Sequence, residues 1–208
     1  VFLAVVFMPP GSEPTSGSVS FEGHDIHAEY ASLRSRIGMV PQDDVVHGDL
    51  TVRQALMYAA ELRLPPDTTK EDREQVVMQV LEELEMTKHL DTRVAKLSGG
   101  QRKRASVALE LLTGPSLLIL DEPTSGVDPI ARDNFWRLLI TLSRQDQVTI
   151  FISTHFMNEA ERCDRMSMMH AGKVLDLPTV FELLRVFLGE CPDRPYYEIL
   201  LGKHLKYP

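Results

Sequence analysis

The stretch that decides the fold lies in the middle of the chain, at residues 97–123, which read LSGGQRKRASVALELLTGPSLLILDEP. Ser98 and Gln101 have the spacing of a helix capping box, and apolar residues then recur at helical intervals. The Gly-Pro pair at 114–115 ends this predicted helix. Residues 116–120 are nearly all apolar, which is typical of a strand buried on both faces of a parallel sheet.

On the C-terminal side the chain continues as helix and strand. Asp128-Pro129 is a favourable pair for a helix start, and the helix behind it carries Phe135, Trp136, Leu139 and Ile140. Residues 148–152 predict a second buried strand, and residues 166–175 predict a hairpin. Strands that alternate with helices predict an α/β fold, with a parallel sheet and right-handed crossovers.

On the N-terminal side, residues 18–22 alternate like a half-buried strand, and residues 37–40 predict a second short strand that Pro41 ends. From Thr51 the apolar period becomes helical, so residues from about 51 to 112 predict an inserted α-helical subdomain. Two helix starts are predicted here, from the pairs Thr51 with Gln54 and Thr68 with Glu71.

Length, net charge and composition limit the classes of protein to which the chain can belong. The 208 residues fit one mid-sized α/β domain, here residues 1–177, with a poorly assigned tail at 178–208. A net charge of -8 argues against direct nucleic-acid binding, which needs a basic surface. Two cysteines form no metal or disulfide framework and favour a reducing, cytosolic setting. No apolar run is long enough to cross a bilayer, so we expect any membrane role to need a partner.

The strongest chemical signal is the glycine-rich start of the helix at Ser98. Gly99 and Gly100 allow close approach of a ligand, and the first amides lie at the positive end of the helix dipole. A phosphate would suit this position. The alternative is an ordinary capped helix with a glycine-rich lead-in.

The second signal is the acid pair that follows the apolar run at 116–120. A buried strand that ends in Asp121 and Glu122 places both at the carboxyl edge of the sheet, where α/β proteins bind ligands. Asp121 is suited to Mg²⁺, and Glu122 to orienting or deprotonating a water aimed at a γ-phosphate. The alternative is a strand that runs into a polar turn.

Three further residues are weak signals when taken singly. Gln42 follows the strand at 37–40, Asp128 would cap a helix in any case, and His155 follows the strand at 148–152. A structural or solvent-facing role is the more common explanation for a lone glutamine or histidine after a strand.

Five segments in this order resemble the motifs of ABC (ATP-binding cassette) ATPases, over about residues 14 to 175. They correspond to the Q-loop, the signature motif, Walker B with the catalytic glutamate, the D-loop and the H-loop, at Val40–Gln42, Leu97–Gln101, Leu120–Thr124, Ser125–Asp128 and Ser153–His155. The order makes coincidence negligible and outweighs the alternative explanations of the weak signals. Val127 replaces the leucine that is more usual in the D-loop. The resemblance implies a P-loop NTPase-like parallel sheet with an inserted helical subdomain.

The resemblance also implies roles within one chain. Glu122 would be the general base, and His155 would contact the γ-phosphate and steady the attacking water. Asp121 would support Mg²⁺. Gln42 would sense both Mg²⁺ and the γ-phosphate of ATP, and couple the site to the helical subdomain.

Other implied roles involve a second ABC ATPase domain in a head-to-tail dimer. The signature residues Ser98, Gly99, Gly100 and Gln101 would bind the ATP held by that domain. Asp128 would carry signals across the dimer.

The phosphate-binding loop, G-x-x-x-x-G-K-[ST], is missing from the 208 residues. Gly172-Lys173 is followed by Val174, and Gly202-Lys203 by His204, so neither pair qualifies. On the family spacing the P-loop lysine would fall at or just before Val1, so we expect a fold that is incomplete at the N-terminus through truncation. The isolated chain should then bind ATP poorly and show no ATPase activity.

The motif variants most resemble bacterial exporters of drugs and lipids and eukaryotic ABCG half-transporters. The leading hypothesis is the energy-coupling ATPase of a membrane exporter, held by a transmembrane permease at the cytoplasmic face of the membrane. Two alternatives remain open. One is a soluble ABC ATPase that acts on ribosomes, and the other is a non-catalytic half-site that donates only its signature motif.

Overall fold

The computed structural model describes residues 17–43, 45–156, 159, 162–165, 167, 169–170 and 173–174. The chain divides into two compact units, one of residues 2–153 and one of residues 154–208 with residue 1. The boundary predicted after residue 177 and the tail at 178–208 lie outside the described residues.

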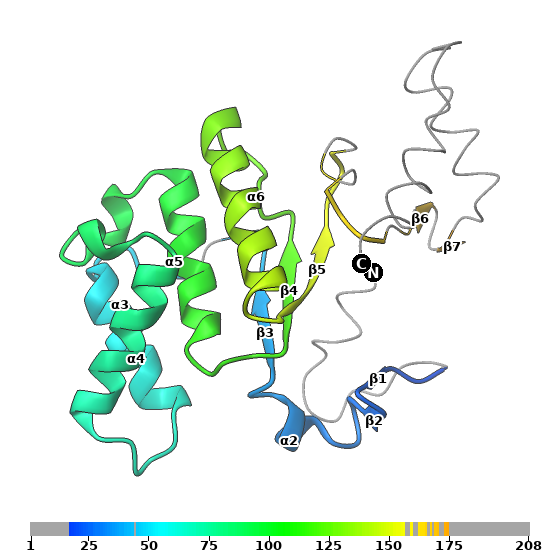
Figure 1. Ribbon diagram of the computed structural model, residues 1–208, viewed down its shortest axis with the longest axis horizontal. Helices are drawn as coiled ribbons and strands as arrows, with labels where there is room; N and C mark the ends of the chain where they lie inside the picture. Colours follow the sequence, from blue (N-terminus) through cyan, green and yellow to red (C-terminus); the bar gives the residue numbers. More distant parts are fainter. Residues whose placement is uncertain are drawn as a thin grey trace. The chain divides into compact units, whose positions relative to one another are not determined.

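The centre of the first unit is a three-stranded parallel sheet in the order β3–β4–β5 (Figure 1). Its strands are β3 (Ile37–Val40), β4 (Leu117–Asp121) and β5 (Thr149–Ser153). The register places Val40 opposite Leu120, and Asp121 opposite Ser153. The carboxyl ends of the three strands therefore meet at one edge, which confirms the predicted parallel α/β arrangement.

Strand β5 is less buried than its apolar sequence predicts. Leu118 and Leu120 of β4 are fully buried, whereas Phe151 of β5 is 43% exposed. Strand β4 has a hydrogen-bonded neighbour on each side, but β5 pairs only with β4 within the described sheet. Burial on both faces was thus a correct prediction for β4 and a wrong one for β5 in the described structure.

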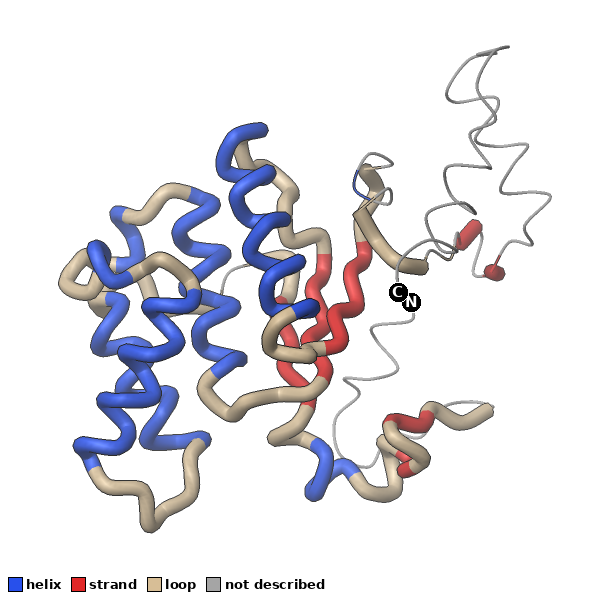
Figure 2. Tube along the Cα trace, viewed as in Figure 1, coloured by secondary structure: helices blue, strands red, loops and turns tan. Residues whose placement is uncertain are grey.

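A group of helices lies beside β3. It consists of α3 (Val52–Arg63), α4 (Lys70–Glu83) and α5 (Gly99–Leu111), with short 3₁₀ turns η1 (Thr87–His89) and η2 (Val94–Lys96). The three helices pack against one another, and α5 also packs against β3 (Figures 1 and 2). Their apolar stripes form the core of this group, with Leu56, Leu81 and Leu84 fully buried.

The helix starts follow the capping predictions with one correction. Complete capping boxes are present at Thr51 with Gln54 and at Ser98 with Gln101. Helix α4, however, begins one residue later than predicted. Its cap is Thr69, whose hydroxyl accepts from the backbone N of Asp72 at 3.1 Å and donates to the Asp72 carboxylate at 2.7 Å. This reciprocal pair fixes the start of the helix in place of the predicted Thr68 pair.

Helix α6 (Pro129–Arg144) crosses from β4 to β5 and packs against α5 and β5. Asp128 caps it, as predicted, by accepting from the backbone N of Ile130 and Ala131. Phe135, Trp136 and Leu139 are buried, whereas Ile140 is 43% exposed. Ile140 therefore lies off the buried stripe.

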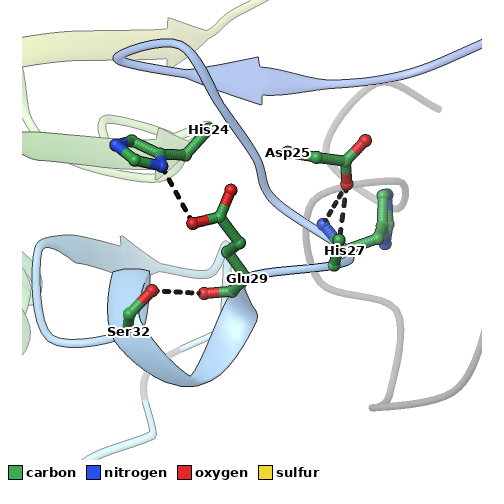
Figure 3. Close-up of polar contacts among 6 residues, drawn as sticks. His24, Asp25, His27, Glu29 and Ser32 are labelled. Atoms are coloured by element: carbon green, nitrogen blue, oxygen red, sulfur yellow. Dashed lines mark hydrogen bonds and ion pairs between the residues drawn. The ribbon is translucent and has the colours of Figure 1, made fainter.

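Two small hairpins complete the described chain. Strands β1 (Ser20–Phe21) and β2 (His24–Asp25) pair around Gly23, whose φ of +84 favours glycine, and α2 (Tyr30–Leu33) follows. The Asp25 carboxylate accepts from the backbone N of Ala28 at 3.0 Å and of His27 at 2.8 Å (Figure 3), and these hydrogen bonds lower its pKa. In the second unit β6 (Met169–His170) pairs antiparallel with β7 (Lys173–Val174), which confirms the predicted hairpin.

Candidate functional site

Two of the predicted site residues meet at the carboxyl edge of the sheet. Gln42 follows β3 and Glu122 follows β4, and these strands are neighbours. The Gln42 Nε2 atom donates to Glu122 Oε2 at 3.3 Å. Residues that are 80 positions apart in the sequence thus form one polar pair.

Ser153, which begins the predicted H-loop but had no predicted role in the site, contacts both acidic residues. Its hydroxyl donates to Asp121 Oδ1 and accepts from the backbone N of Glu122 at 3.2 Å. A hydroxyl can do both, since it has one donor hydrogen and two lone pairs. The backbone N of Glu122 also donates to the carbonyl O of Ser153 at 3.0 Å. The end of β5 therefore orients the Asp121 carboxylate and holds the backbone of Glu122.

Glu122 itself has a strained backbone. Its φ of 40° lies in the left-handed region, which residues other than glycine seldom adopt. Hydrogen bonds from Ser125 N to Glu122 O at 3.1 Å and from Val127 N to Thr124 O at 3.1 Å hold the turn that follows. Strain of this kind gathers at functional sites, where surrounding contacts over-determine the conformation.

The side chains at this edge fit a hydrated Mg²⁺ ion. Asp121, Glu122 and Gln42 offer carboxylate and amide oxygens, which are hard ligands of the kind Mg²⁺ prefers. The described residues contain no group of three or more His, Cys, Asp or Glu able to enclose a metal ion. Water and phosphate oxygens would have to supply the other ligands, as is usual for Mg²⁺ at nucleotide sites.

The two glycines of the signature motif have different surroundings. A Cβ atom built on Gly99 meets nothing within 4 Å, so this position faces open space. A Cβ atom on Gly100 would lie 3.1 Å from Ala131 Cβ and 3.6 Å from Val127 Cγ1. A Cβ atom at Gly100 would therefore crowd the start of α6, whereas packing does not restrict the residue at Gly99.

The Gln101 side chain is engaged within the chain. Its Oε1 accepts from the backbone N of Ser98 at 2.9 Å, and its Nε2 lies 3.1 Å from Nε2 of His89. An amide nitrogen can only donate, so His89 accepts here and fixes the orientation of the amide. Within this chain, Gln101 therefore holds the start of α5 through Ser98 and His89. Its contact with a nucleotide stays a prediction.

His155 belongs to the second unit. Its ring lies against Phe156 with the centroids 4.1 Å apart, and the residue is exposed. The neighbouring Thr154 accepts from Phe156 N at 3.1 Å and donates to the buried Glu159 carboxylate at 2.7 Å. These contacts hold the turn after β5, and the predicted role of His155 toward a γ-phosphate stays a prediction.

Comparison with known proteins places the chain in a family. The sequence profile described as "ABC transporter" matches residues 8–125. The ABC transporter ATP-binding/permease protein Rv1747 of Mycobacterium tuberculosis is 67% identical over 161 residues, which cover 77% of this chain and 18% of that protein. The Nod factor export ATP-binding protein I of Burkholderia orbicola is 36% identical over 164 residues, 78% of this chain and 52% of the relative. The chain thus spans only part of the relatives it matches.

Solved structures show the same fold. The cbiO1 protein of Clostridium perfringens, part of the transporter complex cbiONQ, aligns with a TM-score of 0.74 at 24% identity, over 97% of this chain and 81% of that one. The dimeric ATP-binding cassette MJ0796, bound to ADP and Pi, aligns with a TM-score of 0.69 at 24% identity, over 79% of this chain and 74% of that one. Among the described residues, no helix has the length and apolar character needed to cross a lipid bilayer. The chain belongs to the ABC transporter family and has the α/β fold of its ATP-hydrolysing cassettes.

Proposed function

We propose that this chain is the ATP-binding and ATP-hydrolysing domain of an ABC-type exporter and couples hydrolysis to transport through a permease. The observation that carries the proposal is the contact of Gln42 with Glu122, beside Asp121 and Ser153, at the carboxyl edge of the sheet. The relatives named for an ATP-binding/permease protein and for Nod factor export support transport and its direction.

Glu122 is the general base of the proposed reaction. Its carboxylate accepts a hydrogen bond from a water molecule and takes a proton as the water oxygen bonds to the γ-phosphorus. The bond from that phosphorus to the bridging oxygen breaks, and ADP leaves. Gln42 orients the carboxylate by donating from Nε2 at 3.3 Å, and the strained turn at φ 40° fixes its direction.

Asp121 and Gln42 are the proposed protein contacts of Mg²⁺. Donation of the Ser153 hydroxyl to Asp121 Oδ1 leaves further acceptor capacity on the carboxylate. Donation from Gln42 Nε2 leaves its Oε1 as the oxygen that would serve a cation. Bound Mg²⁺ would neutralise charge on the phosphates during transfer.

The signature motif serves a second cassette in this proposal. The first turn of α5 is capped by Ser98 and open at Gly99, and His89 steadies its Gln101. Such a helix start suits the γ-phosphate of a nucleotide held by a partner domain. The dimer reported for MJ0796 supports pairing of cassettes. Asp128 lies at the start of α6, and its proposed role is to carry signals to that partner.

Two measurements on the complete product of the encoding gene test the proposal. An exporter domain requires that the product sediment with membranes and hydrolyse ATP in a Mg²⁺-dependent manner, with the rate reduced strongly by Asp121→Asn. A product found with ribosomes would favour the ribosome-associated alternative. Hydrolysis unaffected by Asp121→Asn would contradict the proposed metal contact.

A further inference from the structure

Helix α5 carries two charged side chains on the face that meets β3. Lys103 and Glu110 are seven residues apart, which places them two turns apart on one side of the helix. Both contact the backbone of residues 39–42, the end of β3 and the loop that carries Gln42.

Lys103 is a buried cation. Only 5% of its surface is exposed, and its Nζ donates to the carbonyl O of Pro41 at 3.2 Å and of Gln42 at 2.9 Å. Burial of an ammonium group is costly unless it is hydrogen-bonded, so the two carbonyls and the lysine hold one another in place. The carbonyl of Gln42 belongs to the same residue whose side chain donates to Glu122.

Glu110 holds the other end of the same segment. Its Oε2 accepts from the backbone N of Met39 at 3.2 Å, and its Oε1 pairs with Nη2 of Arg63 at 2.8 Å. Arg63 is the last residue of α3 and also donates to the carbonyl O of Leu109 at 2.9 Å. The absence of a side chain at Gly38 permits this approach, because a Cβ there would lie 3.0 Å from Glu110 Cβ.

We propose that Lys103 and Glu110 are positioning residues, which hold residues 39–42 against α5 so that Gln42 meets Glu122. Through Arg63 the same contacts join the loop to the C-terminal end of α3. A displacement of α3 or α5 would then move Gln42 and lower the rate of hydrolysis without removing a group that touches the nucleotide. The inference rests on the proposed function, since the position of Gln42 matters only if Glu122 acts in hydrolysis.

The test uses the complete gene product and compares Lys103→Met with Lys96→Met, an exposed lysine at the end of η2. Lys103→Met removes the ammonium and keeps an apolar stem. We expect kcat to fall roughly 10- to 100-fold, because small misplacements remote from the chemistry have effects of this size. The KM for ATP should change little, Lys103→Arg should recover part of the rate, and Lys96→Met should behave like the wild type.

Hydrogen exchange supplies a readout that does not depend on activity. The amides of Met39, Val40 and Gln42 should exchange faster in Lys103→Met, while those of β4 stay protected. Either an unchanged kcat in folded Lys103→Met or unchanged exchange at 39–42 would overturn the inference. If Lys103→Met does not fold, Glu110→Met decides by the same two readouts, since it removes both the acceptor of Met39 N and the partner of Arg63.

Failure of the underlying function has a different signature. Hydrolysis that persists in Glu122→Gln would refute the proposed base itself, whatever Lys103 does. Loss of hydrolysis in Glu122→Gln with a normal rate in folded Lys103→Met would refute only the positioning role.

Discussion

At the scale of single residues, the neighbours Gly99 and Gly100 have different reasons to be glycine. Gly100 leaves room for Ala131, whose Cβ is fixed to the backbone of α6 and can move only with that helix. Gly99 faces open space, so packing does not account for it. A sequence pattern of two glycines cannot separate these cases, because the difference depends on which helix lies across them.

Alanine at the two positions should therefore affect stability differently. Both substitutions remove a glycine from the same helical turn, so the gain in helix propensity largely cancels in the comparison. Gly100→Ala should be less stable than Gly99→Ala by about 1–3 kcal/mol, the usual cost of overpacking. Denaturant unfolding of the 208-residue chain measures this difference, and equal midpoints and slopes would contradict the packing explanation.

Cys163 in the second unit offers a test by pH. Burial, followed by the negative charges of Asp164 and Glu159, raises the pKa of its thiol. The thiolate is the reactive form, so alkylation of native Cys163 near pH ~8.5 should be slower than alkylation of the unfolded chain. The raised pKa also means that stability falls as pH rises past the pKa of the unfolded thiol.

Iodoacetamide labelling in the Cys191→Ser background isolates Cys163. The rate should rise with pH around a midpoint that is higher in the native chain than in urea. A native midpoint at or below the unfolded one would refute the stated environment.

Residues of the candidate site could be predicted from the sequence only where they stand at the end of a recognisable strand. Gln42, Asp121 and Glu122 stand at strand ends in the sequence, so their presence at the sheet edge followed from the α/β pattern. Ser153 acts through the register of β5 against β4, which the sequence does not specify. Lys103 is a charged residue on a buried face of α5, three positions after Gly100. The sequence does not indicate that its hydrogen-bond partners are the carbonyls of Pro41 and Gln42.

At the scale of elements, helix caps determine where α5 and α6 begin beside the site. Asp128 Oδ1 accepts from the backbone N of Ile130 at 3.2 Å and of Ala131 at 3.0 Å, which accounts for an acid there without any role in signalling. The family resemblance assigns Asp128 a second role across a dimer. The two roles can be separated experimentally, because capping needs only an acceptor oxygen at position 128, whereas the proposed signalling role would need the charged carboxylate.

We predict that Asp128→Ala lowers the free energy of unfolding by about 1 kcal/mol, the usual cost of losing a cap. Asp128→Asn should restore stability, since asparagine also caps well. If the carboxylate has a role across a dimer, Asp128→Asn should still hydrolyse ATP more slowly in the complete gene product. If Asp128→Asn has both the stability and the ATPase rate of the wild type, capping alone explains the aspartate at this position.

Element boundaries were predictable to within about one residue where a cap fixed them. Thr51 and Ser98 cap α3 and α5 as expected. At α4 the cap is Thr69 and not Thr68, because the Thr69 hydroxyl forms hydrogen bonds with both the backbone N and the carboxylate of Asp72. Burial was less predictable, because the exposure of Phe151 depends on the place of β5 in the sheet. The apolar composition of residues 148–152 predicted strand β5, but it did not predict which strands lie beside β5 in the sheet.

At the scale of the whole molecule, the 208 residues contain the proposed general base Glu122 and the signature motif but no P-loop sequence. A P-loop supplies backbone amides and a lysine to the phosphates, and these contacts provide much of the affinity for ATP. We therefore predict that the isolated chain has no measurable ATPase activity and binds Mg²⁺-ATP weakly. A phosphate-release assay measures the activity, and turnover abolished by Glu122→Gln in the isolated chain would contradict the prediction.

Glu122, whose carboxylate is oriented by Gln42 and whose backbone is held by Ser153, is the proposed base for ATP hydrolysis. The most direct measurement is the steady-state rate of phosphate release by the complete gene product, compared among the wild type, Glu122→Gln and the exposed control Glu82→Gln. Loss of a positioned base should lower kcat by roughly 10²- to 10⁴-fold while binding of Mg²⁺-ATP persists. A Glu122→Gln protein that hydrolyses ATP at the wild-type rate would contradict the claim.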